Sequence, residues 1–189
     1  MTSYALSYCL NRDRTNCYQT QFVLRYNYYE GFQTMGQTSG AYIFRPSEKT
    51  IRGSLPYSTP QKAIVYRGKN LIQIQINGKT VISNLRIYND ITNGIELQSF
   101  IDSISITDGA GKEVVLDINV PSINNNNIFY TDSMGMEMQK RVLNYRPTWD
   151  LKVSQPVAGN YYPVQSTIAI QDINTNEGFA YNFEIFLLF

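Results

Sequence analysis

Hydrophobic and polar side chains alternate with a period of two over much of this chain. In the clearest stretch, polar residues alternate with Ile72, Ile74 and Ile76, and the alternation resumes beyond Asn77-Gly78. An Asn-Gly pair is typical of a tight hairpin turn in which both residues have a positive φ. The pattern therefore predicts an antiparallel hairpin over residues 70–89.

The alternation changes parity further along the chain. Apolar residues stand at odd positions after Asn93-Gly94 and at even positions from Ile104 onward. A parity change within one strand indicates an extra residue, so we expect a bulge or bend near Asp102-Ser103. We expect a loop at 108–111, and then a strand from Val114 to Val120 that ends at Pro121.

Short strands separated by Gly, Asn and Pro account for most of the remaining sequence. No window longer than about ten residues shows a helical period with caps. The sequence therefore predicts an all-β fold, an antiparallel β-sandwich that is incomplete in this chain. Further strands are expected at 21–29, 41–45, 62–67, 128–131, 137–145 and 161–171.

The two ends differ from the middle in composition. Residues 1–20 are polar without a clean period and are interpreted as a poorly ordered leader. Residues 21–172 form the expected domain. Residues 173–189 are a divergent tail that begins polar, ends apolar and is expected to add one more strand.

Composition and charge exclude several classes of function. The chain has 16 Lys and Arg against 15 Asp and Glu, with no basic block, so we do not expect nucleic-acid binding. It has no His, which excludes a Ser-His-Asp or Cys-His apparatus within this chain. Only Cys9 and Cys17 are available to a zinc site without His, and their spacing leaves a disulfide and two free thiols equally open.

No segment shows a signal-peptide pattern or the roughly 18–20 apolar residues of a membrane span, so no membrane partner is expected. The 15 Tyr and 9 Phe favour strands. They could also line a sugar site, although packing in the sheet core is the preferred interpretation.

Three blocks of sequence carry a resemblance to a known family. They are Ser-Gly-Ala-Tyr-Ile-Phe-Arg-Pro at 39–46, Phe-Tyr-Thr-Asp-Ser through Tyr-Arg-Pro-Thr-Trp at 129–149, and Pro-Val-Ala-Gly-Asn-Tyr-Tyr-Pro-Val at 156–164. In this order they resemble the region that follows the catalytic domain in lysosomal-type α-mannosidases of glycoside hydrolase family 38. The resemblance extends over residues 20–172.

The resemblance implies a retaining hydrolase of terminal α-mannosyl bonds, active in mannose and glycoprotein-glycan breakdown and located in the lysosome or secreted. Such enzymes use an aspartate nucleophile, an aspartate acid/base and a zinc ion held by two His and two Asp, all upstream of the matching region. The implied partners are mannose-containing glycans and the family's catalytic domain. In this chain alone we expect no catalytic residue, no metal ligand and no cofactor.

One site residue carries over from the family pattern. The Ser-Gly-Ala-Tyr block contributes a tyrosine to the family's mannose pocket, and the matching residue is Tyr42. A strand that ends at Pro46 would project the phenol toward a neighbouring domain. The alternative is that Tyr42 is a half-buried tyrosine of a strand.

Other polar residues in the blocks have structural interpretations. Asp132 is expected in an Asx turn rather than in a carboxylate pair with Glu137. Arg146 is expected to pair with a local acid or to stack on Tyr145 or Trp149. Tyr162, which precedes Pro163, is expected in an extended segment that packs against the core.

Several residues depart from the family pattern. Met134 and Met136 replace the usual Asn and Arg, so the turn there should depend on Gly135. Two other functions remain open: a stand-alone carbohydrate-binding β-sandwich, and an inactive truncated gene product that would be poorly soluble because its sheet edges are unpaired.

Overall fold

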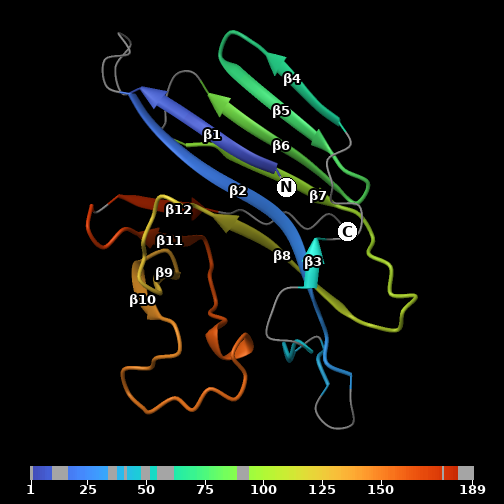
Figure 1. Ribbon diagram of the computed structural model, residues 1–189, viewed down its shortest axis with the longest axis vertical. Coiled ribbons are helices and arrows are strands. Elements are labelled where there is room, and N and C mark those ends of the chain that lie inside the picture. The colour runs from blue at the N-terminus through green and yellow to red at the C-terminus, as the bar shows by residue number, and fades with distance from the viewer. Residues whose placement is uncertain are drawn as a thin grey trace. The chain divides into compact units, whose positions relative to one another are not determined.

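The computed structural model describes residues 2–9, 17–33, 38–40, 42–47, 52–54, 62–88, 94–175 and 177–182, and these are almost entirely strands, turns and loops (Figure 1). The chain divides into two compact units, residues 1–119 and 120–189. No helix in the part of the chain that the structure describes is long and apolar enough to cross a membrane.

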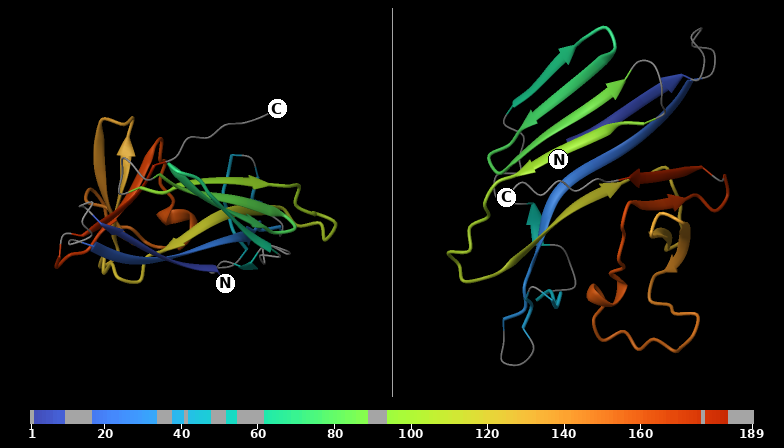
Figure 2. Two further views of the ribbon diagram at one scale, coloured as in Figure 1. Left: turned by 90° about the horizontal axis from the view of Figure 1, so that it is seen from above. Right: turned by 180° about the vertical axis from the view of Figure 1, so that it is seen from behind.

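Unit 1 contains two antiparallel sheets. In the first, the long strand β2 (Cys17–Glu30) pairs along one edge with β1 (Thr2–Cys9) and β3 (Arg52–Ser54), and along the other edge with β8 (Lys112–Asn119). The second is a meander of β4 (Lys62–Arg67), β5 (Leu71–Asn77), β6 (Val81–Tyr88) and β7 (Glu96–Ile101) (Figure 2).

The two sheets of unit 1 meet at a tyrosine. Tyr26 on β2 accepts a hydrogen bond from Ser83 Oγ on β6 at 3.1 Å, and its hydroxyl also bonds to Ser99 on β7. Apolar side chains of the same face, including Ile76, Val81 and Leu85, are buried, with Leu85 only 3% exposed. Burial of apolar residues between facing sheets is the arrangement that holds a β-sandwich together.

Unit 2 contains one antiparallel sheet with the strand order β10-β9-β11-β12. Its strands are β9 (Ile128–Ser133), β10 (Glu137–Val142), β11 (Thr167–Gln171) and β12 (Gly178–Asn182). A short 3₁₀ helix, η1 (Ala158–Asn160), lies in the long connection from β10 to β11. The all-β, antiparallel class predicted from the alternation is therefore confirmed.

The predicted hairpin at 70–89 is confirmed, because Ile72, Ile74 and Ile76 pair with residues 87, 85 and 83. Its turn differs from the prediction. Gly78 N donates to Val81 O at 2.8 Å, and neither Asn77 nor Gly78 has a positive φ. The chain reverses at Lys79-Thr80, so the Asn-Gly pair precedes the turn instead of forming it.

Three other predicted elements differ in extent. The parity change coincides with the end of β7 at Ile101 rather than a bulge, and residues 102–106 are irregular. The segment 161–166 was predicted as strand but is irregular, and β11 begins at Thr167. The prediction of a strand at 41–45 is wrong, because the described residues there form a turn with one isolated bridge, between Gly40 and Ile43.

The ends take part in the sheets. Residues assigned to a leader include β1 and the start of β2, which pair over Thr2–Cys9 with Cys9 opposite Cys17. The predicted extra strand near the C-terminus is β12, which pairs with β11. Residues 183–189, the apolar end of the tail, lie outside the described residues.

Candidate functional site

Tyr42 lies at the tip of a turn and is completely exposed, at 100% of its surface. Gly40 N donates to Ile43 O at 2.9 Å, and Ile43 N donates back to Gly40 O at 3.3 Å. These reciprocal bonds close the turn on both sides of the tyrosine. The phenol is therefore presented to solvent by a fixed backbone, and not half-buried in a strand.

Side-chain hydrogen bonds fix the base of this turn. The hydroxyl of Ser39 donates to Ile43 O at 3.2 Å and accepts from Arg45 N at 3.2 Å. A serine that bonds nearby backbone in this way competes with strand formation, because it gives the chain another way to satisfy its polar groups. This explains why residues 42–45 form a turn despite their aromatic and β-branched composition.

The turn is attached to the end of β2. Phe32 N donates to Arg45 O at 2.8 Å, and Ser47 N donates to Glu30 O at 2.8 Å. The Arg45 guanidinium carbon lies 4.2 Å from the centre of the Phe32 ring, a cation–π distance. These contacts therefore fix the position of the turn relative to the end of β2.

Gly31 permits this close approach. A Cβ at Gly31 would lie 3.1 Å from Ser39 Cβ, and Gly31 N donates to Gly111 O at 2.8 Å. A larger residue at this position would therefore press on Ser39, which would have to shift by a few tenths of an ångström.

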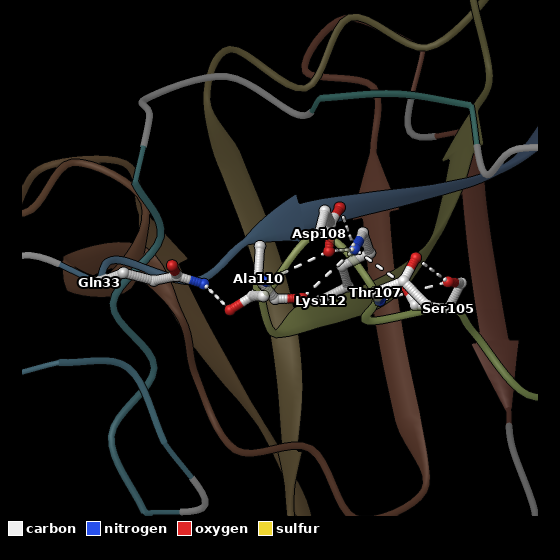
Figure 3. A network of polar contacts seen from close by, with 7 residues as sticks. Gln33, Ser105, Thr107, Asp108, Ala110 and Lys112 are labelled. Atoms are coloured by element: carbon white, nitrogen blue, oxygen red, sulfur yellow. Dashed lines mark hydrogen bonds and ion pairs between the residues drawn. The ribbon is translucent and has the colours of Figure 1, made fainter.

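The loop beneath this attachment is organised by Lys112 (Figure 3). Its ammonium donates to the carbonyl oxygens of Ser105 at 2.9 Å and Ala110 at 3.3 Å, and to both carboxylate oxygens of Asp108 at 2.8 and 2.7 Å. Gln33 Nε2 ties the same loop to the chain after β2 by donating to Gly109 O at 2.7 Å. The sequence predicted a loop at 108–111 but gave no role to Lys112.

The Asp132 carboxylate accepts hydrogen bonds from several backbone N–H groups, which is a structural role. It accepts hydrogen bonds from the backbone N–H groups of Gly135, Gln165, Ser166 and Thr167 at 2.8–3.1 Å, as well as one from Ser166 Oγ. The bond from Ser166 N, together with the other backbone donors, holds the pKa of this carboxyl far below its usual range despite burial. Asp132 closes the turn after β9 as expected, but by a bond from Gly135 N, one residue further on than in an Asx turn. Glu137 instead accepts from Gln139.

Asp172, which sequence reasoning did not single out, has a similar environment. It accepts from the backbone N–H groups of Asn124 at 2.7 Å, Asn174 at 2.8 Å and Thr175 at 3.0 Å. These bonds, led by the one from Asn124, lower the pKa of the carboxyl. The signal available in the sequence was an Asp followed two and three residues later by Asn and Thr, which is typical of an Asx turn.

Arg146 stacks on a different ring from those predicted. Its guanidinium lies 4.8 Å from the ring centre of Tyr162, Arg141 lies 4.7 Å from the same ring, and Phe129 packs edge-on at 5.5 Å. Arg146 also donates to the carbonyl oxygens of Gly159 and Tyr145. Tyr162 is therefore part of the packing, as predicted, and joins β9 and β10 to the connection before β11.

The described residues offer little for acid–base or metal chemistry. Where the pKa of a carboxyl group there departs from its usual value, it is lowered, and a glycosidase acid needs a raised one. No group of three or more Cys, Asp or Glu side chains in this part of the chain could hold a metal ion. With no His in the sequence, the residues present do not fit the zinc site that the resemblance implies.

Comparison with known proteins places these features in a family. The family model for the glycosyl hydrolases family 38 C-terminal domain matches residues 8–180. The lysosomal alpha-mannosidase of Dictyostelium discoideum is 39% identical over 164 residues, which are 85% of this chain and 16% of that protein.

Two further relatives give the same result. The lysosomal alpha-mannosidase of Bos taurus is 37% identical over 79% of this chain and 14% of its own length. The alpha-mannosidase of Canavalia ensiformis is 37% identical over 80% of this chain and 15% of its own length. The chain thus spans about one sixth of the length of the curated relatives it matches, and it belongs to the glycosyl hydrolase family 38 by its C-terminal domain.

Proposed function

We propose that this chain is the β-sandwich portion of an α-mannosidase that hydrolyses terminal α-D-mannosyl residues in mannose and glycoprotein-glycan breakdown. The names of the relatives support the reaction, and the match to the C-terminal domain of the family supports the limited role. The chain then supplies structural support and a contact with the sugar, while the nucleophile, the acid/base and the zinc ligands come from a catalytic domain.

The complete exposure of Tyr42 on a fixed turn carries the second part of the proposal. A phenol both donates and accepts hydrogen bonds, so it can bind a sugar hydroxyl in either sense. Because the turn is held by backbone bonds, little conformational entropy would be lost when the phenol meets a sugar. The names of two relatives give a lysosomal location, and we extend it to this chain as part of the same proposal.

A chimera tests the sugar contact. The matching segment of the Dictyostelium discoideum enzyme is replaced by this chain, and turnover of an aryl α-mannoside is measured with and without Tyr42→Phe. Loss of one hydrogen bond to the substrate should lower kcat/KM about tenfold. Tyr145→Phe, another exposed tyrosine, is the matched control. An active chimera that tolerates Tyr42→Phe would contradict the role of Tyr42.

The chain alone tests the division of labour. We expect no turnover of the aryl α-mannoside, with or without added zinc, because no described residue provides a suitable acid and the sequence has no His. Zinc-dependent turnover by the purified chain would contradict the proposal.

A second candidate function is a stand-alone carbohydrate-binding module. Exposed aromatic side chains in unit 2 favour it, since Trp149 and Tyr161 are both about half exposed. Calorimetric titration with mannobiose separates the two functions. Binding in the millimolar range or tighter that is lost in Tyr161→Ala would support the module, and heats equal to dilution would exclude it.

A further inference from the structure

Two neighbouring register rows on one face of the second sheet of unit 1 are mostly polar, in contrast to the face that meets Tyr26. Side chains alternate between faces along a strand, and Ser83 on β6 points toward Tyr26. Asn84 and Arg86 therefore point to the opposite face of the sheet, together with their register partners on β4, β5 and β7. We call this surface the amide face; its register rows are Tyr66, Gln73, Arg86 and Glu96, and next to them Ile64, Gln75, Asn84 and Gln98.

The polar side chains of the amide face form two groups of hydrogen-bonded residues. Gln73 is central to the first group, because Arg86 Nε donates to its Oε1 at 2.9 Å and its own Nε2 approaches Asn84 Oδ1 at 3.4 Å. Arg86 also donates to Gln98 Oε1 at 2.8 Å and to Glu96.

The second group lies along β5. Tyr66 donates to Gln75 Oε1 at 3.3 Å, and Gln75 Nε2 donates to Asn77 Oδ1 at 3.0 Å. These bonds fix the direction of each amide. An amide has two N–H donors and two lone pairs on its oxygen, so one such bond on each side leaves further capacity for a ligand.

A shallow open depression lies on this part of the sheet. Tyr66, Gly68, Leu71, Gln73 and Gln75 are among the residues that line it. Tyr66 is 50% exposed, so its ring is accessible beside the two glutamines. Gly68 lies in the chain reversal between β4 and β5, and its N–H donates to Leu71 O at 2.8 Å.

The charges of the amide face compensate each other. Arg86 pairs with Glu96, whose other oxygen accepts from Tyr88 at 2.6 Å. The bond from Tyr88 is the main cause that lowers the pKa of Glu96, so this carboxyl stays ionised beside Arg86. An anionic ligand would have to compete with Glu96 for the guanidinium, and an apolar partner would leave the amides without water.

We propose that the amide face binds a neutral oligosaccharide, with Tyr66, Gln73 and Gln75 as the contact residues. A sugar hydroxyl both donates and accepts hydrogen bonds, and an amide group also offers donors and an acceptor. The Tyr66 ring can pack on the apolar face of a pyranose. The hydrogen bonds among these side chains hold the amides in place before binding, which reduces the conformational entropy lost on association. This site is separate from Tyr42 and does not depend on the proposed function.

The experiment is an NMR titration of the complete chain with α-mannotriose and, separately, maltotriose. We expect saturation transfer to at least one of the two sugars and a dissociation constant in the millimolar range. Gln75→Ala and Tyr66→Ala should each weaken binding about tenfold, which corresponds to roughly 1.4 kcal/mol. Gln21→Ala, an exposed glutamine of β2 in the other sheet, is the matched control and should leave binding unchanged.

Thermal unfolding of each variant is measured in parallel, so that a loss of binding counts only in a folded protein. Tyr42→Ala serves as a second control, because binding that disappears in this variant belongs to the Tyr42 turn. The proposal is overturned if neither sugar binds, if folded Gln75→Ala and Tyr66→Ala variants bind like the parent, or if Tyr42→Ala abolishes binding. None of these readings involves turnover, so they are distinct from a failure of the proposed α-mannosidase role.

Discussion

Asp132 in unit 2 and Lys112 in unit 1 perform the same task with opposite charges. Asp132 is 6% exposed and gathers backbone N–H groups from the turn after β9 and from the start of β11. The Lys112 side chain is also 6% exposed and gathers backbone carbonyl groups of the loop before β8. An irregular segment can therefore be held either by a carboxylate that accepts from its N–H groups or by an ammonium that donates to its carbonyl groups.

The difference between them lies in the counter-charge. Lys112 has Asp108 as an ion-pair partner at 2.7 Å. Asp132 is satisfied by neutral donors alone in the bonds described above. Neutralising Asp132 therefore weakens its hydrogen bonds from N–H dipoles, whereas neutralising Lys112 also removes the attraction between two opposite charges.

Substitution of Asp132 should give the largest effect on stability. Asp132→Ala leaves three partly buried N–H groups, those of residues 165–167, without this acceptor, so the melting temperature should fall by many degrees. Circular dichroism on heating measures this fall. Asp150→Ala, an exposed aspartate of the same unit, is the control and should change little. Equal melting temperatures for the two variants would show that Asp132 does not organise unit 2.

Acid should reveal the same carboxylate. Its pKa is lower in the folded than in the unfolded protein, so its contribution is fully present above the usual value of about 4 and is lost as pH falls below it. Urea unfolding at a series of pH values should show stability that decreases below about pH 4. In Asp132→Asn the decrease should be shallower, and an unchanged slope would contradict the shifted pKa.

Substitution of Lys112 should have a smaller effect. Lys112→Met keeps the length of the side chain but removes the donor for Ser105 O, Ala110 O and Asp108, which should cost roughly 1–3 kcal/mol. Hydrogen exchange should increase first at Gly31, whose N–H donates to the loop at Gly111 O. If exchange at Gly31 stays at the parent rate, the loop does not depend on the ammonium.

The smallest predicted change is a gain in stability. Met134 has φ 53°, next to Gly135 at φ 68°, in a turn closed by a bond from Met136 N to Ser133 O at 2.9 Å. Asn tolerates this left-handed conformation better than Met, so Met134→Asn should stabilise the protein by roughly 1 kcal/mol. Met136→Asn, at an exposed neighbouring position without positive φ, should be neutral in the same chemical-unfolding measurement.

This turn also shows where the sequence-based prediction was incomplete. Sequence reasoning expected the turn to depend on Gly135 because Asn is missing at 134. The structure shows that Met134 itself takes a left-handed backbone, so the hairpin pairing of β9 with β10 imposes the conformation on both residues. Register between strands can outweigh the preference of a single residue.

Tyr42 and Arg146 show the same limit at the candidate site and in the packing. The family pattern located Tyr42, but a strand was predicted for residues that Ser39 instead holds in a turn. Stacking of Arg146 was expected on neighbours in the sequence, and the ring it meets is Tyr162, sixteen positions away. The partner of a long side chain depends on contacts that local patterns do not contain.

The sequence alone determined the all-β class, the hairpin of β5 and β6, and the family, because alternation and motif order are properties of neighbouring residues. Only the tertiary structure decided which polar groups are satisfied by which partners. Asp132, Asp172 and Lys112 each collect backbone groups from a loop or turn that must first be positioned by the sheets. Hydrogen bonds between segments that are distant in the sequence form only in the folded protein, and the periodic pattern of the sequence does not predict them.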